Sequence, residues 1–434
     1  MTSAHTRRQF INRLLQAGAV SALPAVGPAA FAQTTFSGKL LVTIQAQGAW
    51  DVTSFCDPKT NVAGEKEINR WARTKSIGTA GNLRYAPFGS NKAFFDKYAA
   101  RMLVINGVDM QTNAHETGEN AAWSGRSALG FPSMTALYAA SVAPNLPLAY
   151  VSFRGWGNTE NIVNQTRINS IGSLRNLAFP NEAFGWGIDR TFFKTSEMEQ
   201  IFALYRKQIS SSVLAPDGLP SDRANRQAYM QALSSSDGLK AFGALIPPES
   251  QIKPGVRVGQ NNNFSTLYQQ AQVATLAFKS GLCVAADLAE GGFDTHDSHD
   301  TNHEPLMAHF LNAIDYLWDY AEEHGLADRL VVVIGSDFSR TPYYNAGDGK
   351  DHWPIGSYVV MEKNAKYTNR MVGETDGGHN ALKIDPTTLQ RSSSGTLIYS
   401  KHFHKALRRY LGLTGNAYDK FFPFNATEDF RFFG

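Results

Sequence analysis

Cysteine is nearly absent from this sequence, since its 434 residues contain only Cys56 and Cys283. No cysteine spacing is typical of a metal site, and no Cys or Met ligand set supports a redox metalloprotein. A disulfide between the two is allowed in an oxidising compartment, whereas the apolar run around Cys283 favours a buried free thiol. A metal ligand in this chain is therefore expected to be a histidine or a carboxylate.

Long apolar runs are also missing, so no segment of the predicted mature chain is expected to span a bilayer. The start of the chain, by contrast, predicts a twin-arginine signal peptide over residues 1–32. Arg7 and Arg8 precede a weakly apolar stretch at 14–31, and Ala30-Phe31-Ala32 fits a small-residue cleavage site. The alternative is an amphipathic helix that stays attached. The prediction implies the twin-arginine translocase as a partner and a periplasmic or secreted mature protein.

An excess of basic charge is lacking once that segment is removed. The chain has 41 basic and 38 acidic residues, and residues 1–32 contain three arginines and no acid. The predicted mature chain is therefore formally neutral and shows no basic stripe. We expect no nucleic-acid partner.

Buried-strand runs alternate with helical stretches through most of the chain, which predicts an α/β fold with a mostly parallel sheet. The runs lie at 39–44, 102–108, 148–153, 281–288, 330–334 and 357–361, and the helical stretches at 92–100, 118–123, 132–143, 264–279, 304–324 and 392–411. Residues 33–434 are expected to form one domain. The span 154–263 has no histidine and predicts an insertion or lid, with helices at 196–210 and 221–235.

The chain is organised around the stretch Gly291 to His299, in which two Asp and two His follow a pair of glycines. Further acids and histidines follow other predicted strands. In an open α/β sheet the carboxyl ends of such strands form the ligand site, so these side chains are expected to converge. The candidate metal ligands are Asp51, Asp294, His296, His299, Asp337, Asp351 and His352. The alternative is that each residue caps its own loop.

Several of these motifs resemble the uncharacterised exported family called "domain of unknown function fifteen-oh-one", of the alkaline phosphatase and sulfatase superfamily. They are Gly48 to Asp51, Gly291 to His296, Gly335 to Pro342, Gly349 to Pro354 and Gly373 to Asp376. The resemblance implies a three-layer α/β/α core and one or two divalent metal ions, usually zinc. It implies a first-strand ligand at Asp51, a central pair of Asp294 with His296 or His299, and late ligands at Asp337 and His352.

The resemblance also implies a hydroxyl nucleophile at a helix start. Thr117 and Thr112 compete for this role near His115, which we count with Thr117 and Arg340 among the candidate catalytic residues. Arg340 is expected to bind an anionic group through its planar fork, or else to form a surface ion pair. The sequence departs from the superfamily at Phe338, where a histidine is common.

The function implied is metal-dependent hydrolysis of a small anionic ester, a phosphate or a sulfate. The alternative is a non-catalytic envelope protein whose metal site is degenerate and whose partner is another protein. A redox metalloprotein is a third class, which twin-arginine export would suit but for which the ligands are missing.

Overall fold

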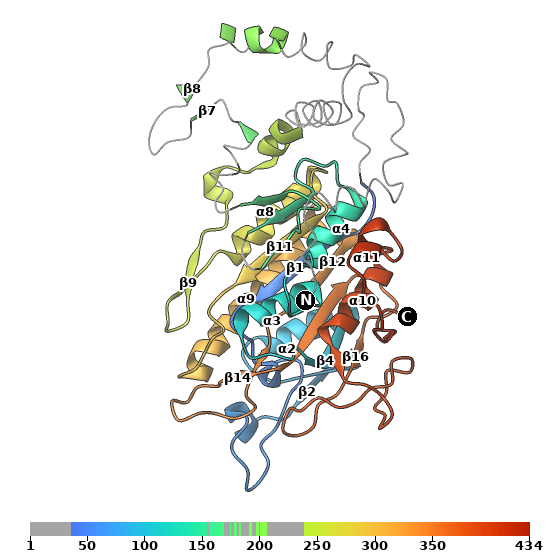
Figure 1. Cartoon of the computed structure of the whole chain (residues 1–434). Helices are drawn as coiled ribbons and strands as arrows, with labels where there is room; N and C mark the ends of the chain where they lie inside the picture. Colours follow the sequence, from blue (N-terminus) through green and yellow to red (C-terminus); the bar gives the residue numbers. More distant parts are fainter. Residues whose placement is uncertain are drawn as a thin grey trace.

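The computed structural model describes residues 36–153, 156–168 and 238–434, together with scattered positions between 174 and 205 (Figure 1). The predicted signal peptide at 1–32 lies outside these residues. Of the predicted helix at 196–210, residues 197, 198 and 200–205 are described and are helical, whereas the rest of it and all of the predicted helix at 221–235 lie outside the described residues.

A nine-stranded sheet forms the centre of the molecule. Its order is β16 (Arg370–Val372), β4 (Met102–Asp109), β15 (Ile355–Glu362), β12 (Leu330–Gly335), β1 (Leu40–Ala46), β11 (Ala285–Glu290), β5 (Tyr150–Ser152) and β6 (Gln165–Arg167), with β17 (Ile398–Tyr399) also beside β4. β15 runs antiparallel to β12 and β4, and the other pairings of this sheet are parallel. The predicted mostly parallel sheet is thus confirmed.

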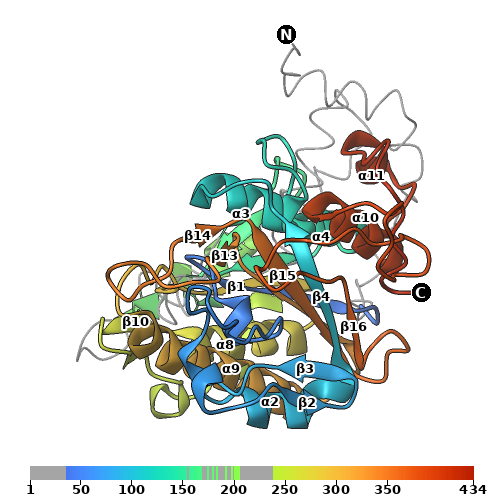
Figure 2. The ribbon, with the colours of Figure 1, turned by 90° about the horizontal axis from the view of Figure 1, so that it is seen from below.

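The two faces of the sheet are covered by different helices because successive side chains of a strand point to opposite faces. Leu40, Val42 and Ile44 belong to one core with α2 (Asn91–Tyr98), α8 (Leu267–Lys279) and α9 (His299–Glu323). Leu41 belongs to a second core with α3 (His115–Ser124), α4 (Met134–Val142) and α10 (Ser400–Tyr410). Figure 2 shows these two helical layers on either side of the sheet, as the predicted three-layer arrangement requires.

Short elements complete the described structure. They are two-stranded pairs of β2 (Gly78–Ala80) with β3 (Leu83–Tyr85), β7 (Glu182–Ala183) with β8 (Thr191–Phe192), β9 (Val256–Val258) with β10 (Asn263–Ser265) and β13 (Ser339–Arg340) with β14 (His352–Trp353), and the helix α11 (Ala417–Phe421). Among the described helices, none has the length and apolar character needed to cross a bilayer.

Both cysteines are buried and unpaired, so the free-thiol interpretation of Cys283 is confirmed and also applies to Cys56. Burial raises the pKa of each thiol, because a thiolate is poorly solvated in an apolar interior.

Candidate metal centre

The site lies at one edge of the sheet. The parallel strands β1, β4, β11 and β12 all end there, and they are followed by Asp51, His115, Asp294 and Asp337 respectively. β15 runs the other way, so its amino end lies at the same edge, just after β14 and His352. The sheet therefore brings together residues separated by more than two hundred positions, as predicted from the strand ends.

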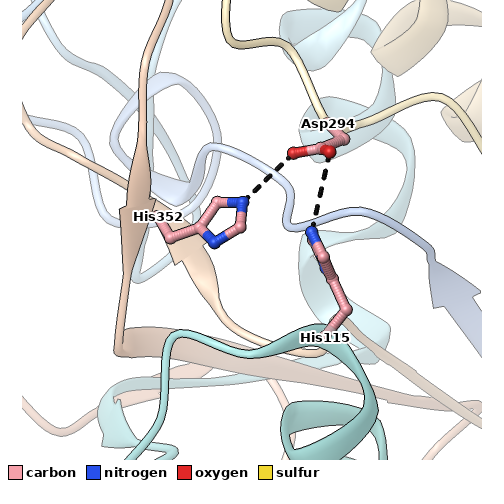
Figure 3. A group of neighbouring side chains, drawn as sticks. All are labelled: His115, Asp294 and His352. Atoms are coloured by element: carbon pink, nitrogen blue, oxygen red, sulfur yellow. Dashed lines mark hydrogen bonds and ion pairs between the residues drawn. The ribbon is translucent and has the colours of Figure 1, made fainter.

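His115, Asp294 and His352 form the centre of this site, and Figure 3 shows the two imidazole rings directed at the carboxylate. Three potential ligand atoms, one from each residue, lie within 4.8 Å of one another. The Nε2 atom of His352 is 3.3 Å from Oδ1 of Asp294, and Nε2 of His115 is 3.6 Å from Oδ2. These distances are close to the separation of two ligands of one ion, because metal–ligand bonds are about 2 Å long.

Glycines hold Asp294 in place. Gly48 has φ of 100°, and a Cβ there would lie 2.7 Å from the backbone nitrogen of Asp294. Gly292, two residues before Asp294, has φ of 97°. Only glycine adopts such angles without strain, so the turns after β1 and β11 can approach each other closely.

His115 is the first residue of α3, and its ring is fixed by Asp337. Its Nδ1 forms a very short contact with Oδ2 of Asp337, a fully buried carboxylate whose Oδ1 accepts from the Ala49 backbone at 2.7 Å. This hydrogen bond, with the charges of Asp337 and Asp294, raises the pKa of His115 against the opposing effect of burial. A carboxylate can only accept, so Nδ1 carries the proton and the lone pair of neutral His115 is on Nε2.

His352 is oriented in the same manner. Its Nδ1 donates to the backbone oxygen of Asn113 at 2.8 Å, which leaves Nε2 for Asp294. Phe338 packs against both rings of the site, with centroid distances of 4.9 Å to His115 and 4.8 Å to His352. The aromatic ring that departs from the superfamily pattern thus supports two candidate ligands by packing.

His296 adds a third imidazole to the group. Its Nδ1 contacts Oδ1 of Asp351 at 2.9 Å, while its Nε2 lies 3.0 Å from Asp294 Oδ1 and 2.9 Å from His352 Nε2. The hydrogen bond from His296 lowers the pKa of Asp351. Asp351 therefore orients a candidate ligand from outside the centre, in the way that Asp337 orients His115.

With an acceptor on each Nδ1, three histidines thus direct their Nε2 atoms at one carboxylate. Lone pairs repel one another and the carboxylate, unless a proton or a metal cation lies among them. Imidazole nitrogen and carboxylate oxygen are ligands that zinc accepts, and a metal-bound histidine usually donates its other ring N–H to an acceptor, as each Nδ1 does here. The residues present therefore fit a divalent metal such as zinc.

Arg340 lies beneath this group rather than facing a substrate. Its side chain is fully buried, so the surface ion-pair alternative is wrong. Nε donates to the Ala49 oxygen at 2.8 Å, Nη1 donates to the Lys350 oxygen at 3.0 Å, and Nη2 contacts the Gly48 oxygen and Asp294. Each guanidinium nitrogen is thus already committed, which does not favour the expected anion-binding role.

The hydrogen bond from Arg340 to Asp294 and the positive charge of Arg340 keep the Asp294 carboxylate ionised. Partial burial acts to raise the pKa of Asp294, but Arg340, followed by His296 and His115, outweighs it and holds the pKa below its usual value. Asp294 is thus a carboxylate at neutral pH, as a metal ligand must be.

Asp51 and His299 form a separate buried group. Oδ2 of Asp51 lies 2.7 Å from Lys350 Nζ and 3.2 Å from His299 Nε2, and all three side chains are fully buried. Asp51 also caps the short turn after β1 by accepting from the Thr53 backbone at 2.9 Å. The structure therefore gives these two predicted ligands other partners, and the capping alternative for Asp51 agrees with its contacts.

His303 also joins this group, although it precedes the helix predicted at 304–324. It is fully buried on α9, stacks on His299 at a centroid distance of 4.5 Å and accepts from the Asp51 backbone at 3.0 Å. Burial is the main cause that holds the pKa of His303 well below its usual value, and charge repulsion from His299 is the second. His303 lies within the helix because α9 begins at His299, five residues before the predicted start at 304.

Thr117 lies in the first turn of α3, two residues after His115. Positions i and i+2 of a helix do not face each other, so Thr117 points away from the face that carries His115. The hydroxyl of Thr112 accepts from the Ala114 backbone at 3.1 Å and so caps the loop before α3. Neither threonine has a described hydrogen bond to Asp294.

Lys350, the buried cation of this second group, was not singled out from the sequence. It stands between Gly349 and Asp351 in a motif that was considered only for its Asp and His. Its position beside a glycine gave a weak signal at best, because a lysine in a polar loop is usually solvated.

Comparison with known proteins gives one family match. Residues 248–390 match the family model described as "Protein of unknown function (DUF1501)". The matched segment contains Asp294, His296, Asp337 and His352, and it confirms the resemblance to this family of unknown function. No curated protein matches the sequence.

Solved structures of similar shape are distant in sequence. Ps i-CgsB in complex with k-i-k-neocarrahexaose is 8% identical, with 91% of this chain and 75% of that chain covered and a TM-score of 0.41. The PsFucS1 sulfatase from Pseudoalteromonas sp. is 10% identical over 94% and 72%, with a TM-score of 0.37. The TAB5 alkaline phosphatase is 10% identical over 77% and 94%, with a TM-score of 0.33. Likeness at this level transfers no activity, substrate or metal to this chain.

Proposed function

We propose that this protein is a metal-dependent hydrolase of phosphate or sulfate esters. The observation that carries the proposal is the convergence of the Nε2 atoms of His296 and His352 on Asp294, with Nε2 of His115 on its other side. The class of ester comes from the superfamily resemblance of the sequence motifs. The metal centre supports the type of reaction.

A divalent metal bound here would polarise the ester oxygens and lower the pKa of a nucleophile. The chain's own residues supply the ligands and hold them rigid through Asp337, Asn113 and Asp351. The side chains of Asp294 and His296 are 46% and 44% exposed, so an ester in solution can reach them.

Water is the nucleophile that these residues favour. The described side-chain partners of Asp294 are three histidines and an arginine, without a hydroxyl among them. Thr117, proposed from the sequence, lies on another face of α3. A Thr117→Ala variant should therefore keep both its metal content and its turnover.

A second candidate is a non-catalytic protein of the cell envelope. The observation that favours it is His115, which occupies the start of α3. The superfamily resemblance implies a hydroxyl nucleophile at a helix start, so an imidazole there is compatible with a site that binds metal without turning over an ester.

Metal analysis combined with a substrate panel separates the two candidates. The purified chain would be loaded with zinc, dialysed, and assayed with p-nitrophenyl phosphate, bis-p-nitrophenyl phosphate and p-nitrophenyl sulfate. The same assays on Asp294→Ala and His352→Ala should show loss of metal and of turnover, whereas His324→Ala, outside the site, should match the wild type. Stoichiometric metal without turnover would favour the envelope protein, and absence of metal binding would contradict the hydrolase.

We also propose that the protein is exported by the twin-arginine route, on the basis of Arg7 and Arg8. Replacement of both by lysine should leave the precursor in the cytoplasm, as measured by fractionation and immunoblotting. Normal amounts of the double variant in the periplasm would contradict the proposal.

A further inference from the structure

A cavity of about 530 Å³ opens beside the candidate metal centre. His352 forms part of its wall, and the Nε2 atom of the same ring faces Asp294. Asp351 also lines the cavity, and its carboxylate contacts His296. A molecule in the cavity would therefore lie next to any group held at the metal centre. A volume of this size is within the range of small-molecule sites.

The charge of the cavity wall is negative. Asp109 and Asp351 line it, and none of the described lining residues is a lysine or arginine. An anionic group is thus disfavoured in the cavity itself, although the proposed substrate carries one. The anionic end of an ester would occupy the metal centre, and the cavity would receive the part beyond the ester bond.

The two carboxylates have acceptor capacity to spare. In Asp109, Oδ1 accepts from the Gln111 backbone at 2.8 Å, and in Asp351, Oδ1 accepts from His296 and from Asn345 at 3.0 Å. The described contacts leave Oδ2 of each residue without a protein donor. Each can accept hydrogen bonds from hydroxyl groups of a ligand.

Aromatic rings supply part of the apolar wall, together with Pro354, Ile355, Ala381 and Leu397. Trp353 donates its indole N–H to the His379 backbone oxygen at 2.8 Å, so its ring is fixed and contributes apolar surface rather than a free donor. Tyr343 is a second aromatic residue of the wall, and Lys66 already lies over its ring, 4.8 Å from the centroid. The cavity thus combines fixed ring surface with carboxylate acceptors.

We propose that this cavity binds the alcohol portion of the substrate and that this portion is an uncharged sugar. A pyranose has C–H faces that pack on aromatic rings and several hydroxyl groups that donate to carboxylates. An apolar alcohol would leave Asp109 and Asp351 without donors, which costs affinity when a polar group is desolvated. That the sugar is the alcohol portion of an ester substrate rests on the proposed hydrolase function. Binding of a free sugar in the cavity does not require hydrolysis.

Titration of the mature chain with methyl glycosides, measured by saturation-transfer NMR and calorimetry, tests this proposal. The probes are methyl glucoside, methyl galactoside and methyl mannoside, with ethanolamine and cyclohexanol as the cationic and apolar comparisons. We expect at least one glycoside to bind with a dissociation constant in the millimolar range, and ethanolamine and cyclohexanol to bind at least tenfold more weakly.

Matched variants locate the binding site. Asp109→Asn keeps the acceptor for Gln111 but removes the charge, and it should weaken glycoside binding about tenfold, as should Tyr343→Ala. Asp385 accepts from the Thr387 and Thr388 backbones in an exposed turn. Asp385→Asn is therefore the control, and this variant should bind the glycosides like the wild type.

The outcomes separate this proposal from the hydrolase proposal. Glycoside binding that depends on Asp109 in a protein that shows no metal binding or turnover would support the sugar site and contradict the hydrolase. Tighter binding of ethanolamine or cyclohexanol, no binding of any glycoside, or binding that neither Asp109→Asn nor Tyr343→Ala weakens would overturn the sugar site.

Discussion

Asp337→Asn should impair metal binding although Asp337, predicted from the sequence to be a ligand, lies behind His115 and not among the candidate ligand atoms. Oδ1 of Asp337 accepts from the Ala49 backbone and from the Ser336 hydroxyl, each at 2.7 Å, and Oδ2 contacts Nδ1 of His115. In the variant, the amide oxygen must face the Ala49 N–H, because the NH₂ group would place two donors against each other there. The NH₂ group then faces His115 and donates to Nδ1.

That donation reverses the tautomer of His115. With Nδ1 accepting, the proton of neutral His115 moves to Nε2, where it blocks the lone pair that would bind the metal. Loss of the acceptor that holds a metal-bound histidine typically lowers metal affinity by about 10- to 100-fold, which equals about 1.4–2.7 kcal/mol. Asp337 is fully buried, and asparagine has nearly the same volume as the aspartate that it replaces. The packing around position 337, and with it the fold, should therefore be retained.

The affinity can be measured by competition with a coloured zinc chelator, with circular dichroism as the check on folding. Asp385→Asn, an isosteric change at an exposed turn, is the control and should have wild-type affinity. A folded Asp337→Asn variant that binds zinc as tightly as the wild type would refute the role assigned to His115 and its tautomer.

Three further outcomes follow from buried contacts at the same sheet edge. Lys350→Met leaves the Asp51 carboxylate buried without its cation, so the free energy of unfolding should fall by about 3–5 kcal/mol in urea titrations. The exposed-pair control Lys92→Met should change it little. Burial acts to raise the pKa of Asp51, but Lys350 and then His299 hold it well below its usual value, so this stabilisation is present above about pH 4 and is lost as the pH falls further. The difference between wild type and Lys350→Met should therefore narrow below about pH 4, and a difference that widens there would contradict the ion pair. Gly118→Ala should lower both the melting temperature and the zinc affinity despite the better helix propensity of alanine, because its Cβ would lie 2.6 Å from the backbone oxygen of Asp337; unchanged values would show that α3 tolerates the shift.

The sheet and its site edge could be predicted from the sequence because the central strands are buried on both faces. Such strands appear as continuous apolar runs, as in 330–334, and the residues after them are polar. The short edge strands β6, β16 and β17 were not predicted. They have two or three residues each, which is too few for a periodic pattern.

The role of each site residue was harder to predict than its location. The sequence shows that Asp294, Asp337 and His352 follow sheet strands or turns at one edge, but not which of them face one another. Asp337 and Asp351 hold histidines from behind, and Arg340 is buried beneath Asp294. These distinctions depend on side-chain direction, which follows from packing rather than from spacing along the chain.

Anomalous diffraction from crystals grown with zinc tests the metal centre most directly. Data collected above and below the zinc absorption edge would locate any bound ion independently of its chemistry. We expect a peak at bonding distance, about 2.0–2.2 Å, from the Nε2 atoms of His115 and His352 and from a carboxylate oxygen of Asp294. Fully loaded crystals with no peak among these three residues, or with the ion bound at Asp51 and His299 instead, would contradict it.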